Sequence, residues 1–354
     1  MGLPRKKNME RIRAAVAQAG SFVFDTGRTL KSVESYCSQA ADMGVRLVVF
    51  PEAFLGGYPK GIDFGARIGS RSPEGREDFR RYWESAIEIP GKEATELSEI
   101  ARRHRFDLVI GVIERKQGTL YCSALFFGAD GELRGNHRKL MPTGSERLVW
   151  GLGDGSTMPT IKTPFGTLGA AICWENYMPL FRTAMYAKGV TIWCAPTVDD
   201  REVWQCTIRH IAVEGRCFVL SACQYLQRWQ CPDDYQAIQG EAPDTVLING
   251  GSVIVSPLGE VLAGPLRGSA GLLVAEIDEA EVIRGKFDLD VVGHYGRPDV
   301  FRLVVDQAEK SSVLSAELKN ENHDLLEAGC KQGSHDGSLS GKKRATAANN
   351  QPGD

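Results

Sequence analysis

The sequence predicts an α/β domain with mixed sheets, and three observations support this fold class. Short apolar runs, most of them four to eight residues long and rich in Val, Ile, Leu and Phe, recur along the chain as buried strands do. Amphipathic stretches alternate with these runs, which is typical of α/β domains. The turn sequences Ala129-Asp130-Gly131 and Pro257-Leu258-Gly259 each join two extended runs, so hairpins interrupt a purely parallel sheet.

The expected elements follow one another without a linker or an internal repeat. Strands are expected at residues 12–18, 46–50, 107–114, 121–128, 166–173, 191–195, 217–223, 251–256 and 271–277, with hairpin partners at 132–136 and 260–263. Helices are expected at residues 28–43, 94–104, 179–187, 202–216 and 279–286. The first helix carries Leu30, Val33 and Cys37 on one face, and Gly44 is expected to end it.

The two ends of the chain differ in composition from the part between them. Residues 1–9 are short and basic, and we expect them to be flexible. Residues 311–354 are polar and contain no aromatic residue, so they bury too little apolar surface to offset their ordering entropy. We expect a disordered polar tail there, with a short helix at 314–328 as the alternative. Residues 10–310 are expected to form a single domain.

Composition excludes several classes of protein. The net charge of −3 gives no basic footprint of a nucleic-acid binder, and no apolar stretch approaches the roughly 18 residues of a membrane helix. The cysteines number nine, an odd count, and form no Cys-x-x-Cys pair, so neither a zinc site nor a disulfide framework is expected. These features predict a cytoplasmic protein without a zinc site. We expect no other metal or cofactor.

The first motif that could contribute a catalytic side chain is Val48-Val49-Phe50-Pro51-Glu52. An apolar strand runs into Pro51, which cannot extend a central ladder, so the strand ends there. Glu52 is therefore expected at the carboxyl end of a strand, where α/β sheets bind ligands. The alternative is an ordinary glutamate facing solvent.

The second motif, Asn136-His137-Arg138-Lys139-Leu140-Met141-Pro142, follows the first hairpin. A solvated basic face is the usual interpretation of an Arg-Lys pair. The functional interpretation is a lysine directed at the same site as Glu52.

The third motif places Cys173 at the end of a strand of small residues, Gly166 to Ile172, shortly before a helix that begins at Pro179. This resembles the strand–turn–helix arrangement of a nucleophile elbow. A nearby helix N-terminus is expected to lower the pKa of the thiol. The alternative is a buried structural cysteine, of which this chain has several. A thiolate nucleophile, a stabilising Lys139 and a proton-transferring Glu52 would together form a hydrolytic site. No histidine has an evident catalytic partner, which disfavours a Cys–His enzyme.

With its motifs in this order, the chain resembles the nitrilase branch of the carbon–nitrogen hydrolase superfamily over roughly residues 12 to 305. The motifs are Phe-Pro-Glu-Ala at 50–53, His-Arg-Lys-Leu-Met-Pro-Thr at 137–143, Gly-Asp-Gly-Ser at 153–156 and Ala-Ile-Cys-Trp-Glu-Asn-Tyr-Met-Pro at 171–179. The Cys-Trp-Glu-Asn form is similar to true nitrilases rather than to amidases and carbamoylases. The resemblance implies that Glu52 is the general base, Lys139 the electrostatic stabiliser and Cys173 the nucleophile. It adds Glu146, which would help to position the substrate or the lysine.

The resemblance also implies a four-layer αββα sandwich and a homodimer that builds larger or spiral homo-oligomers. The implied reaction converts an aromatic, arylaliphatic or cyanoalanine-like nitrile to its acid and ammonia through a covalent cysteine thioimidate and thioester. We expect residues beside the catalytic groups to line the pocket: Tyr58, Trp174 and Thr197. Core packing is the preferred alternative for Trp174.

Two further functions stay open. The first is an amidase, or a nitrile-hydrating activity that stops at the amide, because the tetrahedral intermediate can expel either ammonia or the thiol. The second is a non-catalytic assembly protein, against which the presence of Glu52, Lys139, Glu146 and Cys173 together argues.

Overall fold

The computed structural model describes residues 11–311 and residue 313. A first, six-stranded sheet has the order β13-β1-β2-β3-β4-β5. β1, β2 and β3 are parallel, whereas β13, β4 and β5 pair with their neighbours antiparallel, so the sheet is mixed. Its strands are β1 (Arg11–Gln18), β2 (Val45–Val49), β3 (Asp107–Lys116), β4 (Thr119–Phe127), β5 (Leu133–Arg138) and β13 (Gly271–Asp278).

A second sheet has the order β10-β11-β9-β8-β7-β6, and β12 pairs with β11 outside that path. β7, β8 and β9 are parallel, and the remaining pairs are antiparallel. Its strands are β6 (Ile161–Thr163), β7 (Gly166–Ala170), β8 (Ile192–Thr197), β9 (Phe218–Cys223), β10 (Tyr225–Gln227), β11 (Val246–Val255) and β12 (Val261–Arg267).

Three of the helices in the described residues, α1, α2 and α6, begin where a local side chain accepts from one of the first backbone amides. Asp25 accepts from the backbone N–H of Arg28 at the start of α1, and Ser72 accepts from that of Gly75 at the start of α2. The helices are α1 (Thr26–Asp42), α2 (Pro73–Ser85), α3 (Lys92–His104), α4 (Pro179–Ala187), α5 (Glu202–Gly215) and α6 (Glu279–Lys286). Within the described part of the chain, no helix is both long and apolar enough to cross a membrane.

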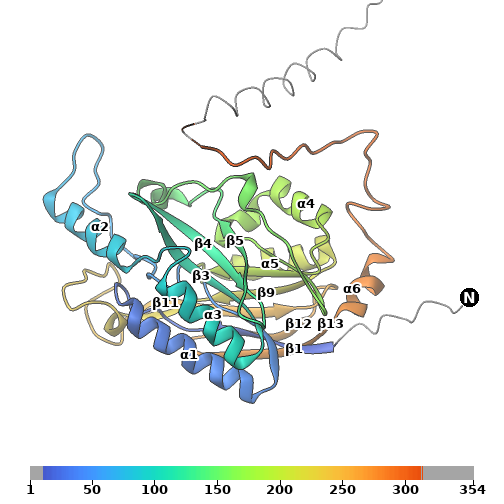
Figure 1. The fold of residues 1–354 in the computed structure, drawn as a ribbon, viewed down its shortest axis with the longest axis horizontal. Helices are drawn as coiled ribbons and strands as arrows, with labels where there is room; N and C mark the ends of the chain where they lie inside the picture. The colour runs from blue at the N-terminus through green and yellow to red at the C-terminus, as the bar shows by residue number, and fades with distance from the viewer. Residues whose placement is uncertain (1–10, 312, 314–354) are drawn as a thin grey trace, which may run out of the picture. The chain divides into compact units, whose positions relative to one another are not determined.

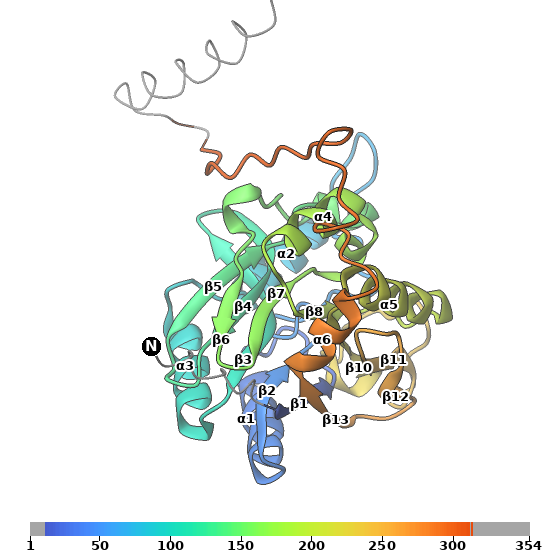
Figure 2. The ribbon, with the colours of Figure 1, turned by 90° about the vertical axis from the view of Figure 1, so that its right-hand side faces the viewer.

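Alternating side chains of the strands divide the core into three clusters. Leu47 and Val49 of β2 join the cluster between the sheets, together with residues of β7, β8 and β9. Val48 and Phe50 point to the other face and join α1 and α3. Trp193 of β8 packs with α4 and α5 on the outer face of the second sheet. The layers are therefore αββα, as expected, and Figures 1 and 2 show α1 and α3 separated by the sheets from α4 and α5.

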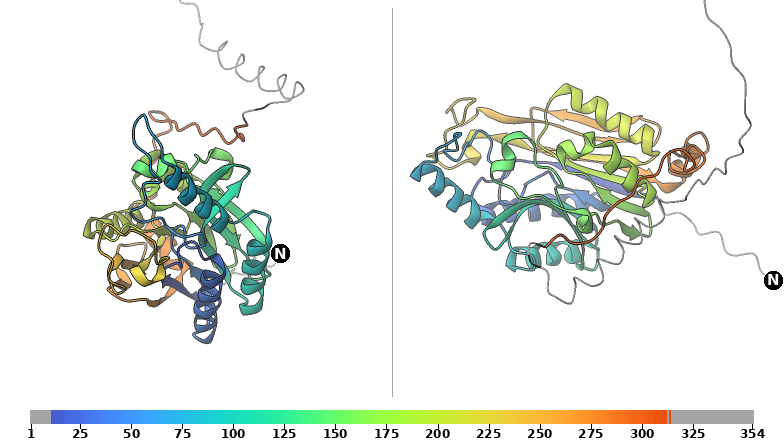
Figure 3. Two further views of the ribbon diagram at one scale, coloured as in Figure 1. Left: turned by 90° about the vertical axis from the view of Figure 1, so that its left-hand side faces the viewer. Right: turned by 90° about the horizontal axis from the view of Figure 1, so that it is seen from above.

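Most expected elements are present, and the differences have local causes. Both hairpins form, as β4–β5 and β11–β12. The expectation of a strand over 166–173 is wrong at its end, because β7 stops at Ala170 and Cys173 begins a 3-10 helix, η3 (Cys173–Tyr177). The sequence analysis missed β6, β10 and α2, although Ser72-Pro73 is a good helix start. α2 and the loop before it project from one end of the domain (Figures 1 and 3). The expected flexible segment 1–9 and, apart from residues 311 and 313, the expected polar tail 311–354 lie outside the described residues.

Gly111 of β3 sets the position of the turn that follows β2. Its N–H donates to the carbonyl of Pro51, and its own carbonyl accepts from Phe54. A Cβ on Gly111 would lie 2.2 Å from the Pro51 carbonyl oxygen and 2.6 Å from Cα of Glu52. Both atoms belong to the backbone and cannot rotate away, so only glycine allows the Glu52 turn to approach β3 this closely.

We therefore expect Gly111→Ala to lower the free energy of unfolding by about 1–3 kcal/mol, the usual cost of overpacking a well-packed core. Equilibrium unfolding in urea measures the change. Gly118→Ala, in the β3–β4 turn, is the matched control because its added Cβ meets nothing within 4 Å. Equal stability of the two variants would contradict the close approach.

Candidate active site

Residues that follow three strand ends meet at one edge of the two sheets. Glu52 follows β2, Lys139 follows β5 and Cys173 follows β7, while Thr197 is the last residue of β8. Glu146 lies in a short 3-10 helix, η1 (Gly144–Leu148), which comes shortly after Lys139. Carboxyl ends of strands are the usual ligand-binding edge of α/β sheets.

A buried ammonium group lies between two carboxylates. Lys139 Nζ donates to Glu52 Oε1 at 2.6 Å and to Glu146 Oε2 at 2.8 Å. The side chains of Lys139 and Glu52 are both fully buried. A buried charge is costly unless it is paired and hydrogen-bonded, so each of the three groups depends on the others.

Local contacts fix the position of Glu146. Its Oε2 also accepts from the backbone N–H of Thr143 at 2.6 Å, and this contact closes the first turn of η1. Its Oε1 accepts from the Tyr58 hydroxyl at 2.9 Å. The Tyr58 ring packs edge-on against Trp150, with 5.9 Å between the ring centroids, and Trp150 also covers the Lys139 ammonium. Tyr58 therefore lies in the site, as a neighbour of Glu146.

Cys173 is held in a left-handed conformation at the start of η3, with φ of 49°. Non-glycine residues adopt this conformation rarely, and it is frequent at functional sites. Asn176 supports the turn by donating to the carbonyls of Ala171 at 2.9 Å and Cys173 at 2.7 Å. Thr197 Oγ1 donates to Cys173 Sγ at 3.3 Å, so Thr197 contacts the sulfur itself.

Burial dominates the electrostatics of the site. It raises the pKa of Glu52 to about 7, while Lys139 lowers it and Glu146 raises it. Burial and then the Glu52 charge raise the pKa of the Cys173 thiol, with Lys139 and Thr197 opposing. Burial lowers the pKa of Lys139, but the surrounding acidic groups outweigh it and hold that pKa well above its ordinary value. The expectation of a lowered thiol pKa is wrong for this resting site, because desolvation and the acidic neighbours outweigh the lowering effects of Lys139 and Thr197.

A small cavity of about 200 Å³ opens above Cys173. Trp174 lines it with 42% of its surface exposed, so the core-packing interpretation of Trp174 is wrong. The Trp174 indole donates to Asp199 Oδ2 at 2.9 Å, and Arg201 pairs with the same carboxylate. The residues that line the cavity are Tyr58, Lys60, Thr143, Glu146, Cys173, Trp174, Val198, Asp199, Asp200 and Arg201.

The sequence analysis missed several residues of the site. Cys122 Sγ lies 3.6 Å from Glu52 Oε1, and no sequence signal marks it, because β4 brings it there through pairing with β3 and β5. Two charged residues that line the cavity, Asp199 and Arg201, were also missed, although they lie two and four residues after the predicted Thr197. Among the described residues, no cluster of three or more His, Cys, Asp and Glu side chains is arranged to hold a metal ion.

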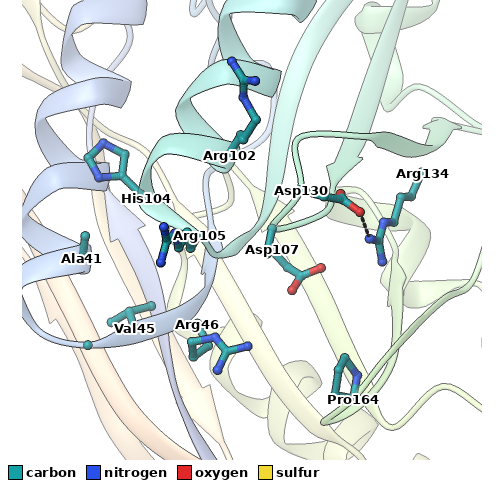
Figure 4. Close-up of a pocket in the computed structure, with 12 residues that line it drawn as sticks. Ala41, Val45, Arg46, Arg102, His104, Arg105, Asp107, Asp130, Arg134 and Pro164 are labelled. Carbon is teal, nitrogen blue, oxygen red and sulfur yellow. Dashed lines mark hydrogen bonds and ion pairs between the residues drawn. The ribbon is translucent and has the colours of Figure 1, made fainter.

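A larger cavity, of about 820 Å³, lies at the opposite ends of the strands (Figure 4). Val45 and Asp107, which begin β2 and β3, line it together with Arg105 and Arg134. Arg105 directly follows α3, where a cation is favourable beside the helix carboxyl end. Since Glu52, Lys139 and Cys173 follow the carboxyl ends of their strands, the larger cavity is remote from Cys173.

The chain is similar to known proteins over most of its length. The sequence profile of the carbon–nitrogen hydrolase family matches residues 13–287. An aliphatic nitrilase of Sinorhizobium fredii is 54% identical over 87% of this chain and 99% of its own length. A bifunctional nitrilase/nitrile hydratase of Lupinus angustifolius is 54% identical over 89% of this chain and 92% of its own length.

Among solved structures, similar folds occur at low identity. The Caenorhabditis elegans NitFhit protein matches with a TM-score of 0.66 and 19% identity, over 85% of this chain and 69% of that one. An amidase from Nesterenkonia sp. matches with a TM-score of 0.58 and 20% identity, over 81% of this chain and 98% of that one. At these identities the likeness concerns the fold alone, which is the αββα sandwich.

Proposed function

This chain belongs to the carbon–nitrogen hydrolase family, and from that premise we propose that it is a nitrilase, which hydrolyses an organic nitrile to the carboxylic acid and ammonia. The observation that carries the proposal is the buried Lys139 between Glu52 and Glu146, beside a strained Cys173 that opens onto a cavity. A purely structural or assembly role would not require this costly arrangement of buried charges.

In the first step, Glu52 takes the proton of the Cys173 thiol and the sulfur attacks the nitrile carbon. A pKa of about 7 lets Glu52 both accept and return a proton near neutral pH. The proton passes to the nitrile nitrogen, which gives a covalent thioimidate. Because burial makes free thiolate costly, proton transfer and attack are coupled through Glu52.

In the following steps, water adds to the thioimidate and the tetrahedral carbon expels ammonia, which leaves a thioester on Cys173. A second water gives its proton to Glu52, attacks the thioester and releases the acid and the thiol. Lys139 stabilises the charge that develops on the substrate, and Glu146 holds Lys139 in place. Each such group contributes roughly 10²-fold or more to the rate.

Amide formation is the second candidate activity. If the tetrahedral intermediate expels the sulfur instead of ammonia, the product is the amide. One of the similar proteins is named a bifunctional nitrilase/nitrile hydratase, and that name covers both the acid and the amide product. We therefore propose acid as the main product and amide as a minor one.

For the substrate we propose an aromatic, arylaliphatic or cyanoalanine-like nitrile. Tyr58 and Trp174 supply aromatic surface to the cavity. Its volume of about 200 Å³ is below the usual range for drug-sized ligands, and Lys60 and Arg201 give its rim polar character. The small volume of the cavity and its charged lining favour the smaller, polar nitriles among the proposed substrates.

We also propose a cytoplasmic homo-oligomer built from homodimers. The odd number of cysteines supports a reducing compartment.

The proposed assembly has a candidate surface on the outer helices. Leu180 of α4 and Val203 of α5 are large apolar residues that lie more than half exposed there, which supports a self-association surface. Light scattering of the full chain measures the assembly, and a monomer at micromolar concentration would contradict it.

We expect the wild-type protein to release acid and ammonia from at least one small nitrile in a panel that spans the proposed classes. Cys173→Ala should release neither product, because it removes the sulfur that forms the proposed covalent intermediate. Chromatography of acid and amide together with an ammonia assay gives the measurement. Cys206→Ser, which changes an exposed cysteine of α5, is the control and should keep wild-type turnover. Full activity of Cys173→Ala would rule out the mechanism, and turnover of amides alone would rule out the nitrilase assignment.

We expect kcat/KM to fall as the pH decreases below about 7. Glu52 must be ionised to accept the thiol proton, and its pKa is raised to about 7, so protonation below that pH removes the base. The decline should approach tenfold per pH unit for a single essential group. A pH–rate profile with the best nitrile checks this. A profile that stays flat well into the acidic range would contradict Glu52 as the base.

A further inference from the structure

One buried carboxylate connects the two halves of the site, and the mechanism above gives it no role. Glu175 Oε2 accepts from the backbone N–H of Ile172 at 2.7 Å, and Oε1 accepts from that of Leu140 at 2.6 Å. Ile172 precedes Cys173, and Leu140 follows Lys139. Ile172 follows β7 of the second sheet, and Leu140 follows β5 of the first sheet. Glu175 therefore connects the two sheets at the edge where the proposed catalytic side chains lie.

His137 completes this connection. Its Nε2 lies 2.9 Å from Glu175 Oε2 and its Nδ1 lies 2.6 Å from the carbonyl oxygen of Thr157. The Thr157 carbonyl oxygen can only accept, so Nδ1 carries a proton, and Nε2 donates to the Glu175 carboxylate when the ring is an imidazolium. Burial and Lys188 oppose this charge, Glu175 favours it, and the net pKa of His137 is raised. The Phe181 ring packs on the imidazole, with 5.5 Å between the centroids.

We propose that Glu175, held by His137, is a positioning residue that sets the distance between the Cys173 sulfur and the Lys139–Glu52 pair. Its two oxygens fix the backbone next to the nucleophile and the backbone next to the lysine at the same time. The inference rests on the proposed function only for its turnover readout, because the reactivity of Cys173 can be measured without any nitrile.

The geometry explains why the effect concerns catalysis as well as folding. Cys173 is in a left-handed conformation that the chain does not favour by itself, and Ile172 N–H is the backbone group that leads into it. Glu52 must lie within proton-transfer distance of the sulfur, and a shift of about 1 Å at a reacting group costs roughly 10²-fold in rate. A carboxylate that holds both sides limits such shifts.

The test is Glu175→Gln, which keeps the size of the side chain. The amide has one acceptor oxygen, so either Leu140 or Ile172 loses its partner and faces an NH₂ donor. We expect kcat to fall about 10²-fold with a change in KM of less than about threefold. We also expect alkylation of Cys173 by iodoacetamide, followed site by site with mass spectrometry, to slow about tenfold.

Glu114→Gln is the matched control. Glu114 is also a buried carboxylate, and it accepts from Ser123, Asn136 and Arg138 within the first sheet without a hydrogen bond to the nucleophile loop. We expect it to lose stability but to keep kcat and Cys173 alkylation within about twofold per folded molecule. If Glu175→Gln resembles this control, with lower stability but unchanged kcat and alkylation, the positioning role is wrong.

His137→Gln tests the same contact if Glu175→Gln does not fold. Glutamine can donate to Glu175 but carries no charge, so we expect an intermediate fall of about tenfold in kcat and a slower alkylation of Cys173. Wild-type kcat and alkylation in folded His137→Gln would overturn the proposal. If both variants slow alkylation but the wild type turns over no nitrile, the positioning role stands and the proposed function fails.

Discussion

The arrangement of the site depends on one constraint, which is the burial of the Lys139 ammonium between Glu52 and Glu146. A buried charge without partners would cost several kcal/mol, so the fold must deliver both carboxylates to within hydrogen-bond distance of Nζ. Gly111 lets the Glu52 turn approach β3, and the first turn of η1 presents Glu146. Stability and the proposed chemistry are therefore linked, because the same two carboxylates that stabilise the buried lysine also hold it beside Cys173, where the proposed mechanism needs it.

The same burial sets the protonation of Cys173, the proposed nucleophile. Desolvation raises the pKa of both Cys173 and Glu52, so the resting pair is a neutral thiol beside a carboxylate that titrates near neutrality. Thr197 is the one side chain that donates a hydrogen bond to the sulfur among the contacts of the described residues. This arrangement suits a base that moves one proton back and forth in each step. It differs from a cysteine activated by an adjacent histidine, where an imidazolium stabilises a permanent thiolate.

Local patterns and family motifs in the sequence were enough to predict the fold class and the main residues of the candidate site. The alternation of strands and helices indicated the fold class, and the motifs indicated Glu52, Lys139 and Cys173. The sequence could not predict exposures and contacts that depend on residues far apart in the chain. Trp174 looked like a core residue by its type, yet the turn at η3 exposes it to the cavity. His137 had no evident partner in the sequence because Glu175 lies 38 residues away, in η3 beyond a strand of the other sheet. The raised pKa of the thiol depends on burial, which no local motif reports.

The central claim is that Cys173 carries the substrate covalently. Rapid quenching of the protein with a turned-over nitrile, followed by mass spectrometry of the intact chain and of its peptides, tests it most directly. The account predicts an adduct with the mass of the thioimidate or the acyl thioester on the peptide that contains Cys173, formed faster than or as fast as product is released. Turnover with no adduct on any cysteine, or with the adduct only on a cysteine other than Cys173, would contradict it.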